Sequence, residues 1–341
     1  MARATNTSTA HPPAPWPDDW FEPASACLWC AGTALEPRID GVEDTYFGAV
    51  PGRFAFARCR DCGALVLTRR PAPERLGLAY RDYYTHAPAA AAPEAPQGWR
   101  QRIGRPLLAA RARTRFAGST APADLALAAL ARLFPSRCAE VDALHRHLPP
   151  APARVLDYGC GNGAFLALAR ALGHEVVGVD VDPGALAQAR ARGLAVFDPG
   201  QLPGEGPPFG PFAHISLVHV LEHVAEPVAL LARLRGWLLP GGALFAELPN
   251  ADAAGLARHG RFWRGLEAPR HFSLPSRTAL ERALREAGYR VERIGQRAFA
   301  AGFMDREAQA ARRRHPGLPA GPLHGPEPAG PEFLTVLARP R

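Results

Sequence analysis

The stretch Val155-Leu-Asp-Tyr-Gly159-Cys-Gly161-Asn-Gly163-Ala-Phe-Leu166 decides the fold of the larger part of this chain. A short apolar run typical of a buried strand leads into three glycines at alternate positions, and a helical pattern follows. Glycines let the main chain approach a ligand closely and point N–H groups at it. The spacing G-x-G-x-G differs from the G-x-G-x-x-G of dinucleotide-binding proteins.

An acidic residue follows the glycine loop at a telling distance. Asp180 lies seventeen residues after Gly163, at the end of the next predicted strand, Glu175-Val-Val-Gly-Val-Asp180. A carboxylate at that place can accept hydrogen bonds from both hydroxyls of a ribose. The glycine loop and the acid together predict a binding site for a nucleoside-type cofactor.

The surrounding sequence alternates short apolar runs with helical stretches, which is typical of βαβ units and a parallel sheet. We expect strands at 154–157, 175–180, 194–197, 214–218, 243–247, 289–294 and 333–338. Helices are expected at 164–172, 184–192, 226–239 and 276–287, and residues 301–331 have a loop-like composition.

Residues 154–250 resemble class I S-adenosylmethionine-dependent methyltransferases of the type-23 kind. The resemblance rests on the "LDxGCGxG" and "GVDxDP" motifs and on Val218-His-Val-Leu-Glu-His-Val224, Leu238-Leu-Pro-Gly-Gly242 and Leu248-Pro-Asn250. It implies an α/β, Rossmann-like domain with a seven-stranded, mostly parallel sheet. It also implies cofactor-binding roles for Asp157 (orienting the loop), Gly159, Gly161 and Gly163 (methionine moiety), Asp180 (ribose) and Asp198 (adenine). The alternative is an ordinary βαβ turn with no ligand.

The loop after the fourth strand of this domain carries the candidate catalytic residues His219, Glu222 and His223. His223 is the candidate general base, because an ordinary histidine pKa of ~6.5 suits proton removal at neutral pH. Glu222 would orient it or face the cofactor; alternatively, both residues only cap the next helix. The string H-x-x-E-H also occurs in zinc peptidases, but Pro227 and the preceding strand exclude the continuous helix that such a site needs. Some quinone-pathway O-methyltransferases hold a divalent metal in this loop with acidic residues and a histidine. Here the first of these positions is His219, so whether this loop binds a metal stays open.

The segment Phe262-Trp263-Arg264-Gly-Leu-Glu-Ala-Pro-Arg270-His271-Phe272 resembles a "W-x-G-x-x-x-P-R-H" sequence of many such methyltransferases. Trp263 and His271 are predicted to line the pocket for the methyl acceptor. Arg270 is predicted to receive an anionic group of that acceptor. The alternative is a packed segment with a buried aromatic ring and a hydrogen-bonded histidine.

Four of the six cysteines form two pairs, Cys27-Leu-Trp-Cys30 and Cys59-Arg-Asp-Cys62. Each pair can supply half of a tetrahedral set of thiolates, so the spacing predicts one structural Zn²⁺ with no position left for substrate. The alternative is a set of free or redox-active thiols. Zinc-ribbon-like starts precede many bacterial methyltransferase domains, and sugar C-methyltransferases have a four-cysteine module, although they extend further at the carboxyl end.

The chain therefore divides into a disordered amino terminus (1–24), a zinc-ribbon-like β module (25–70), a helical connector or lid (71–150) and an S-adenosylmethionine-binding methyltransferase domain (151–341). Trp20-Phe21 is a possible anchor within the first of these. Tyr84, in the run Tyr80-Arg-Asp-Tyr-Tyr-Thr-His86, is predicted to reach the substrate from the module; the alternative is interdomain packing.

Composition limits the function classes. The 341 residues carry a net charge of +8, but all 40 basic residues are arginines scattered among acids, within a general Arg, Ala, Pro and Gly bias. Charge therefore gives little reason to expect a nucleic-acid partner. No stretch approaches the ~20 apolar residues of a membrane helix and no secretory signal is visible, so we expect a cytoplasmic protein.

Two functions follow. The favoured one is methyl transfer to an O or C centre of a sugar-, lipid- or secondary-metabolite-like molecule. The alternative is an RNA methyltransferase whose zinc module binds the substrate. A non-catalytic cofactor sensor fits less well, because the loop, Asp180 and the pair Glu222-His223 occur together.

Overall fold

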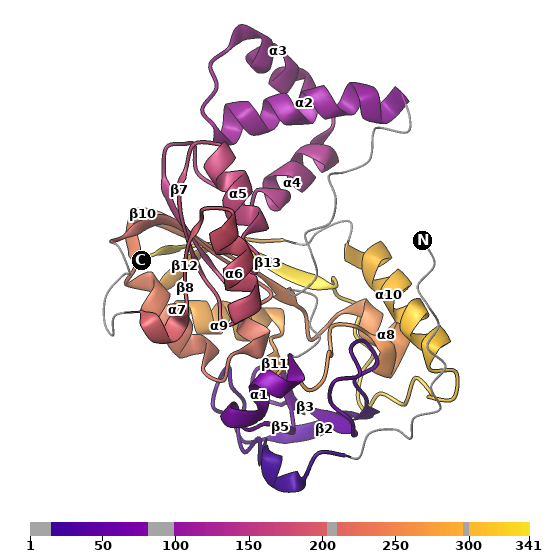
Figure 1. Cartoon of the computed structure of the whole chain (residues 1–341). Helices are drawn as coiled ribbons and strands as arrows, with labels where there is room; N and C mark the ends of the chain where they lie inside the picture. The colour runs from indigo at the N-terminus through magenta and orange to yellow at the C-terminus, as the bar shows by residue number, and fades with distance from the viewer. Residues whose placement is uncertain (1–14, 81–98, 203–209, 296–299) are drawn as a thin grey trace.

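The computed structural model describes residues 15–80, 99–202, 210–295 and 300–341. A central sheet with helices on both faces forms the body of the molecule, an amino-terminal β module lies at one end, and helices between residues 99 and 131 lie at the other (Figure 1). Along the described ranges, no helix has the length and apolar character that a membrane crossing requires.

The central sheet has seven strands in the order β12-β13-β10-β9-β6-β7-β8. Its strands β6 to β10 pair in parallel, and β13 runs antiparallel to both β10 and β12. The predicted seven-stranded, mostly parallel sheet is therefore confirmed. The strands are β6 Arg154–Tyr158, β7 Glu175–Val179, β8 Ala195–Phe197, β9 Phe212–Val218, β10 Leu238–Pro249, β12 Tyr289–Gly295 and β13 Phe333–Pro340.

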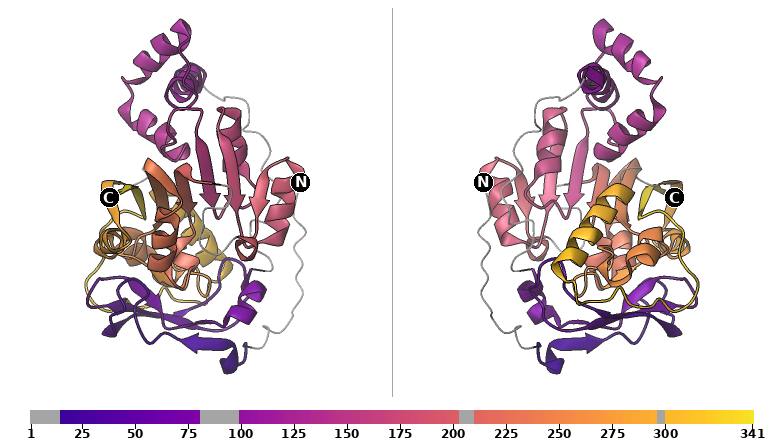
Figure 2. Two further views of the ribbon diagram at one scale, coloured as in Figure 1. Left: turned by 90° about the vertical axis from the view of Figure 1, so that its left-hand side faces the viewer. Right: turned by 90° about the vertical axis from the view of Figure 1, so that its right-hand side faces the viewer.

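Alternate residues of the parallel strands feed two different cores, as a pleat of period two requires. Val155 and Val176 pack on the face covered by α5 (Ala164–Ala171) and α6 (Pro183–Ala191). Leu156 and Val177 pack on the face covered by α7 (Pro227–Arg235) and α9 (Arg277–Glu286). Figure 2 shows both layers from the two sides.

The helices α6 and α9 each begin with a side-chain cap, close to the starts that the sequence predicts. The Asp182 side chain accepts the N–H groups of Gly184 and Ala185 at the start of α6. The Ser276 hydroxyl accepts the N–H of Ala279 at the start of α9. Such caps satisfy N–H groups that a helix leaves without partners.

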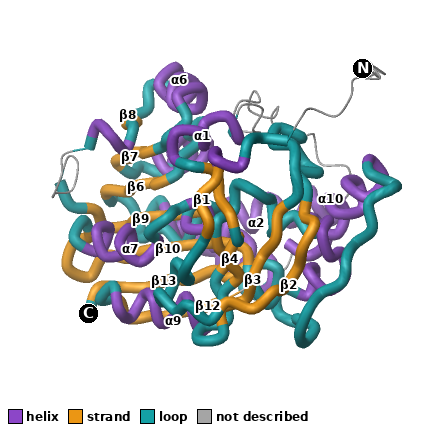
Figure 3. The backbone as a smooth tube through the Cα atoms, turned by 90° about the horizontal axis from the view of Figure 1, so that it is seen from below, coloured by secondary structure: helices purple, strands orange, loops and turns teal. Residues whose placement is uncertain are grey.

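The amino-terminal β module is completed by a strand from the far part of the chain. Its four-stranded sheet has the order β11-β4-β3-β2, in which β11 (Ser273–Leu274) pairs with β4 (Leu65–Leu67). The other strands are β2 Leu35–Val42, β3 Phe54–Cys59, and the separate pair β1 Phe21–Pro23 and β5 Arg69–Pro71. Figure 3 shows the module across one end of the central strands. The module therefore shares its fold with residues some 200 positions away rather than standing alone.

The connector begins with the predicted helical patch, α1 (Pro73–Ala79), and continues with α2 (Trp99–Phe116), α3 (Pro122–Ala131) and α4 (Pro135–Leu144). Figure 1 places α2 and α3 at the end of the molecule opposite the module. These two helices therefore do not cover the edge of the sheet that meets the module, and a lid role does not fit them. Phe116 and Val141 join the core beneath α5.

Two sequence-based expectations need correction. The sequence predicts disorder over residues 1–24 apart from an anchor at Trp20-Phe21, whereas Asp18–Trp20 forms a 3₁₀ turn, η1, and Phe21–Pro23 forms β1 paired with β5. A loop was expected over residues 301–331, but α10 spans Ala300–Arg314, with Met304, Ala308 and Ala311 buried along one face. The i, i+4, i+7 spacing of these small or apolar residues is helical.

The remaining short elements lie between β10 and β11 or beside the parallel strands. They are η3 (Pro199–Gln201), η4 (Leu221–His223), α8 (Ala254–His259) and η5 (Gly260–Phe262).

Candidate functional site

The predicted glycine loop joins β6 to α5, and its glycines are required by geometry. Gly159, Gly161 and Gly163 all have positive φ, at 82°, 53° and 77°. A Cβ on Gly159 would lie 2.3 Å from Cγ2 of Val220, and one on Gly163 would lie 2.4 Å from Cδ1 of Leu194. A side chain at either position would be strained at this φ and would need a shift of these neighbours, so the packing of the loop requires glycine there.

Asp180, at the end of β7, lies directly against this loop. One carboxylate oxygen accepts the N–H of Gly161 at 2.7 Å, and the other accepts the N–H of Asp182 at 2.9 Å. Burial raises the pKa of Asp180, and these N–H groups lower it in part. The structure therefore brings together the loop and the acid that the sequence predicted as one site.

Asp157 and Asp198 lie near the carboxyl ends of β6 and β8, the two strands on either side of β7. Asp157 is fully buried at the end of β6, where it forms an ion pair with Arg146 and accepts the Ser216 hydroxyl at 2.8 Å. Asp198 follows β8 and accepts the N–H of Gly200 at 2.7 Å as the cap of η3. Sequence reasoning missed Arg146, because nothing in its local sequence indicates a contact with a strand.

His219 directly follows β9, and the other two predicted catalytic residues, Glu222 and His223, lie in η4. Nδ1 of His219 lies 3.1 Å from Oε1 of Glu222, and Glu222 is fully buried. Burial alone would raise the pKa of Glu222, but the hydrogen bond and the charge of His219 lower it to about 2. The same pairing raises the pKa of His219. Glu222 is therefore a carboxylate at neutral pH.

His223 lies beside His271, and their ring centroids are 4.6 Å apart. Nδ1 of His223 lies 3.0 Å from the carbonyl oxygen of Arg270, and Nδ1 of His271 lies 2.7 Å from that of Gly265. A carbonyl only accepts, so Nδ1 carries the proton in each ring and Nε2 carries the lone pair. Burial lowers the pKa of both histidines to about 4, which corrects the ordinary value assumed for His223.

Sequence reasoning missed Tyr80 as a residue of this site. Its hydroxyl oxygen lies 2.8 Å from Nδ1 of His223, 143 positions along the chain. The only signal was its place at the start of the run that ends at His86. The residue predicted from that run, Tyr84, lies outside the described residues.

Two predicted contacts with the acceptor do not fit the structure. Trp263 is fully buried, and its indole N–H donates to Oε2 of Glu332 at 2.7 Å. Arg270 is fully buried, and its guanidinium binds both carboxylate oxygens of Asp44. Both side chains are fully buried, so the structure gives no support to Trp263 as a wall of the acceptor pocket or to Arg270 as the group that receives an anion of the acceptor. Internal packing and ion pairing explain both residues.

Glu222, His223 and His271 also form a set of possible metal ligands. One oxygen of the carboxylate and one nitrogen of each ring lie within 4.8 Å of one another. The structure itself therefore permits two chemistries here, proton transfer and metal binding, which an experiment can separate.

The four predicted zinc ligands meet in the module. Their sulfur atoms all lie within 4.8 Å of one another, with Cys27 and Cys62 at 3.5 Å and Cys30 and Cys59 at 3.5 Å. Burial and the neighbouring sulfurs raise the pKa of the Cys30 thiol to about 11. A cation would relieve this crowding by binding four thiolates, so the residues fit a structural Zn²⁺.

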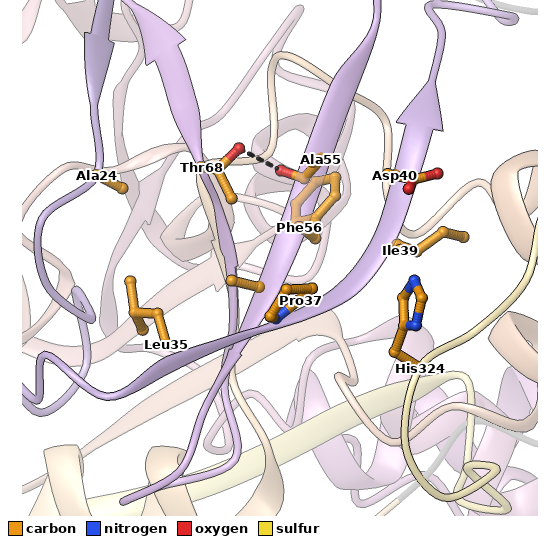
Figure 4. Close-up of a pocket in the computed structure, with 10 residues that line it drawn as sticks. Ala24, Leu35, Pro37, Ile39, Asp40, Ala55, Phe56, Thr68 and His324 are labelled. Atoms are coloured by element: carbon orange, nitrogen blue, oxygen red, sulfur yellow. Dashed lines mark hydrogen bonds between the residues drawn. The ribbon is translucent and has the colours of Figure 1, made fainter.

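A cavity of about 260 Å³ lies on the module, between β2, β3 and the carboxy-terminal loop (Figure 4). Its walls are mostly apolar, with Asp40 and His324 at the rim. It contains none of the residues described above, and we assign it no role.

Comparison with known proteins finds similarity over part of the chain. Residues 130–294 match a family described as a methyltransferase domain. A ubiquinone biosynthesis O-methyltransferase of Xylella fastidiosa is 33% identical over 125 residues, covering 33% of this chain and 49% of that protein. A trans-aconitate 2-methyltransferase of Methylobacterium nodulans is 40% identical over 115 residues, covering 32% and 43%. The chain thus spans about half the length of the curated relatives it matches or less.

Solved structures with a similar outline include an S-adenosylmethionine-dependent methyltransferase from Mesorhizobium loti. It is 21% identical, covers 59% of this chain and 97% of its own, and has a TM-score of 0.42. The fold assignment does not depend on this likeness. It rests on the family match of residues 130–294 and on the strand order of the central sheet, which together indicate a Rossmann-like methyltransferase fold.

Proposed function

We propose that this chain transfers a methyl group from S-adenosylmethionine to an oxygen or carbon centre of a small-molecule acceptor. The observation that carries the proposal is the hydrogen bond between Asp180 and Gly161, at the same edge of the sheet as η4. The parallel strands β6, β7 and β9 end there together, which supports a cofactor site and a catalytic base at one edge of the sheet.

The cofactor supplies a methyl group already activated by a positively charged sulfur. The glycines of the loop would lie against its methionine part, Asp180 would accept its ribose hydroxyls, and Asp198 would lie near its adenine. Asp157, held by Arg146 and Ser216, keeps the end of β6 in place. This chain therefore mainly has to align the acceptor and remove its proton.

His223 is the proposed base. Its Nδ1–H is held by the carbonyl of Arg270, so Nε2 can accept the proton of an acceptor O–H or C–H. Removal of that proton by His223 would leave the acceptor an electron pair with which to attack the methyl group that the bound cofactor would supply, with S-adenosylhomocysteine as the leaving group. The carboxylate of Glu222 stabilises the imidazolium that forms. Because burial lowers the pKa of His223 to about 4, the ring is neutral at pH 7, and as a base it is weaker than an ordinary histidine.

A small-molecule acceptor is favoured over RNA by the charges of the module. Five of its arginines form ion pairs with carboxylates: Arg53, Arg58, Arg60, Arg69 and Arg70. Paired guanidinium groups have less to offer a phosphate backbone. The relatives named above are also methyltransferases whose names refer to small molecules.

We infer that the four cysteines hold a structural zinc. The module's sulfurs lie in the same core as Leu280 and Leu284 of α9, and the Ser276 hydroxyl donates to the carbonyl of Cys62 at 2.5 Å. A zinc there would stabilise the contact between the module and the methyltransferase domain.

The test incubates purified protein with cofactor carrying a labelled methyl group and with fractions of a small-molecule extract. Transfer of label to a small molecule by the wild type, with a loss of at least ~100-fold in His223→Gln, supports the proposal. Label in RNA, with binding that weakens steeply as salt rises, would replace it with the alternative. Activity that a chelator abolishes while the cysteine zinc remains bound would assign Glu222, His223 and His271 to a metal instead.

A further inference from the structure

The buried side chain of Arg270 joins the module to the methyltransferase domain. Its Nη2 lies 2.5 Å from Oδ1 of Asp44, and its Nη1 lies 3.0 Å from Oδ2 of the same carboxylate. The two residues are 226 positions apart, and both side chains are almost completely buried. Such a two-pronged pair fixes orientation as well as charge, because the guanidinium and the carboxylate are both planar.

Asp44 is itself held rigidly by its own loop. Its carboxylate accepts the N–H groups of Phe47 at 3.2 Å, Ala49 at 2.9 Å and Val50 at 3.3 Å. The guanidinium carbon of Arg270 lies over the face of the Phe47 ring, 4.4 Å from its centroid. The loop between β2 and β3 therefore holds the Asp44 carboxylate and the Phe47 ring in place to bind the Arg270 guanidinium.

Arg270 is connected to the proposed base, His223, in two ways. Its Nη1 donates to the carbonyl oxygen of Ala79 at 3.0 Å, and Ala79 immediately precedes Tyr80. Its main-chain carbonyl accepts from Nδ1 of His223 at 3.0 Å, and the Tyr80 hydroxyl lies 2.8 Å from that nitrogen. One residue thus sets the place of the two oxygen atoms that lie against His223.

Because the charge of Arg270 is buried, its contacts with its partners are hard to break. An unpaired buried guanidinium is strongly unfavourable, so Arg270 must keep its partners, which also include Glu267 with an oxygen 3.5 Å from Nε. A shift of Asp44 would therefore move the Arg270 main chain or strip its charge of a partner. Either change reaches His223 through the carbonyl that holds its ring.

We propose that Arg270 and Asp44 are positioning residues through which the cysteine module orients His223 and Tyr80 for proton transfer. This inference rests on the proposed function for its purpose. It assigns Arg270 to the interior of the enzyme, in place of the acceptor-binding role that its sequence suggested.

The test observes the His223 ring directly in the full-length protein with ¹⁵N-labelled histidine. The Nδ1–H signal of His223, assigned by its loss in His223→Gln, should be present in the wild type and exchange slowly with solvent. In Asp44→Asn it should vanish or exchange at least about tenfold faster, because the carbonyl that holds it has moved. Arg270→Lys keeps the charge but loses the two-pronged geometry, so it should have the same effect and serves if Asp44→Asn fails to fold.

Two control variants separate positioning from general stability. Glu43→Gln removes an exposed ion pair with Arg53, next to Asp44, and should leave the His223 signal unchanged. Asp142→Asn breaks a mostly buried pair with Arg111 in the connector, so it should lower stability without changing that signal. The proposal is overturned if Asp44→Asn and Arg270→Lys lower stability as Asp142→Asn does while the His223 signal stays as in the wild type.

The measurement needs neither cofactor nor acceptor. A protein that binds no S-adenosylhomocysteine but loses the His223 signal in Asp44→Asn would refute the proposed function and keep the coupling. A protein that binds S-adenosylhomocysteine, with an unchanged His223 signal in Asp44→Asn and Arg270→Lys, would keep the proposed function and refute the coupling.

Discussion

Replacing one of the four clustered cysteines should remove a metal from the module. In a tetrahedral site with Zn–S bonds of about 2.3 Å, neighbouring sulfurs lie ~3.8 Å apart. The sulfurs of Cys27 and Cys62, and those of Cys30 and Cys59, lie 3.5 Å apart, close to that value. Cys59→Ser takes away one of the four ligands and leaves three crowded cysteines, of which Cys27 and Cys62 are buried. We therefore expect the wild type to contain about one zinc per chain and Cys59→Ser to contain almost none.

The size of the effect follows from linkage. A metal present at 1,000 times its dissociation constant stabilises the folded state by ~4.1 kcal/mol. At roughly 2–4 °C per kcal/mol for a domain of this size, its loss should lower Tm by roughly 8–16 °C. The buried indole of Trp29, which donates to the Ser273 hydroxyl at 2.9 Å beside the site, should report the change in its fluorescence.

Elemental analysis and thermal unfolding followed by tryptophan fluorescence are the assays. Cys138→Ser is the matched control, because Cys138 is a buried cysteine in α4, outside the module, with its sulfur 3.0 Å from the carbonyl oxygen of Ala131. It should keep the zinc. A metal-free wild type with an intact module, or a Cys59→Ser variant that still holds one zinc, would refute the reasoning.

Two further predictions concern the methyltransferase domain. Gly159→Ala places a Cβ 2.3 Å from Val220 at a φ of 82°, so calorimetry should show at least ~10-fold weaker S-adenosylhomocysteine binding, whereas Gly241→Ala, with similar φ but open space, should bind normally. Acidification should destabilise the fold: the folded-state pKa values of His223 and His271 are lowered to about 4, so their contribution is fully present above pH ~6.5 and declines as the pH falls toward 4. Urea unfolding at pH 7 and pH 5 checks this, and a wild type equally stable at both, or a His223→Gln variant with the same slope, would contradict it.

The parts of the site that lie close together in sequence could be predicted from it. The glycine loop and Asp180 belong to consecutive parallel strands, and such strands end at one edge of the sheet. The positive φ values at Gly159 and Gly163 also follow from residue type, because only glycine adopts them freely. The two cysteine pairs predicted their own cluster by spacing alone.

The parts that depend on distant contacts could not be predicted. Trp263 and Arg270 stand in a motif that suggests a pocket, but their roles are decided by Glu332 and Asp44, which lie far away in the chain. Tyr80 reaches His223 only because the module lies at the carboxyl edge of the central sheet. The lowered pKa of His223 has the same origin, since burial comes from tertiary packing rather than from neighbours in sequence.

The account depends most on the binding of a nucleoside cofactor at Asp180. Calorimetric titration with S-adenosylhomocysteine tests it directly on the wild type, on Asp180→Ala and on Asp182→Ala, which removes the cap of α6 but not the contact with Gly161. We predict one site in the wild type, similar affinity in Asp182→Ala, and a loss of ~100-fold or more in Asp180→Ala, since two hydrogen bonds to a charged group contribute about 3 kcal/mol. No binding to the wild type, or unchanged affinity in Asp180→Ala, would contradict the central claim.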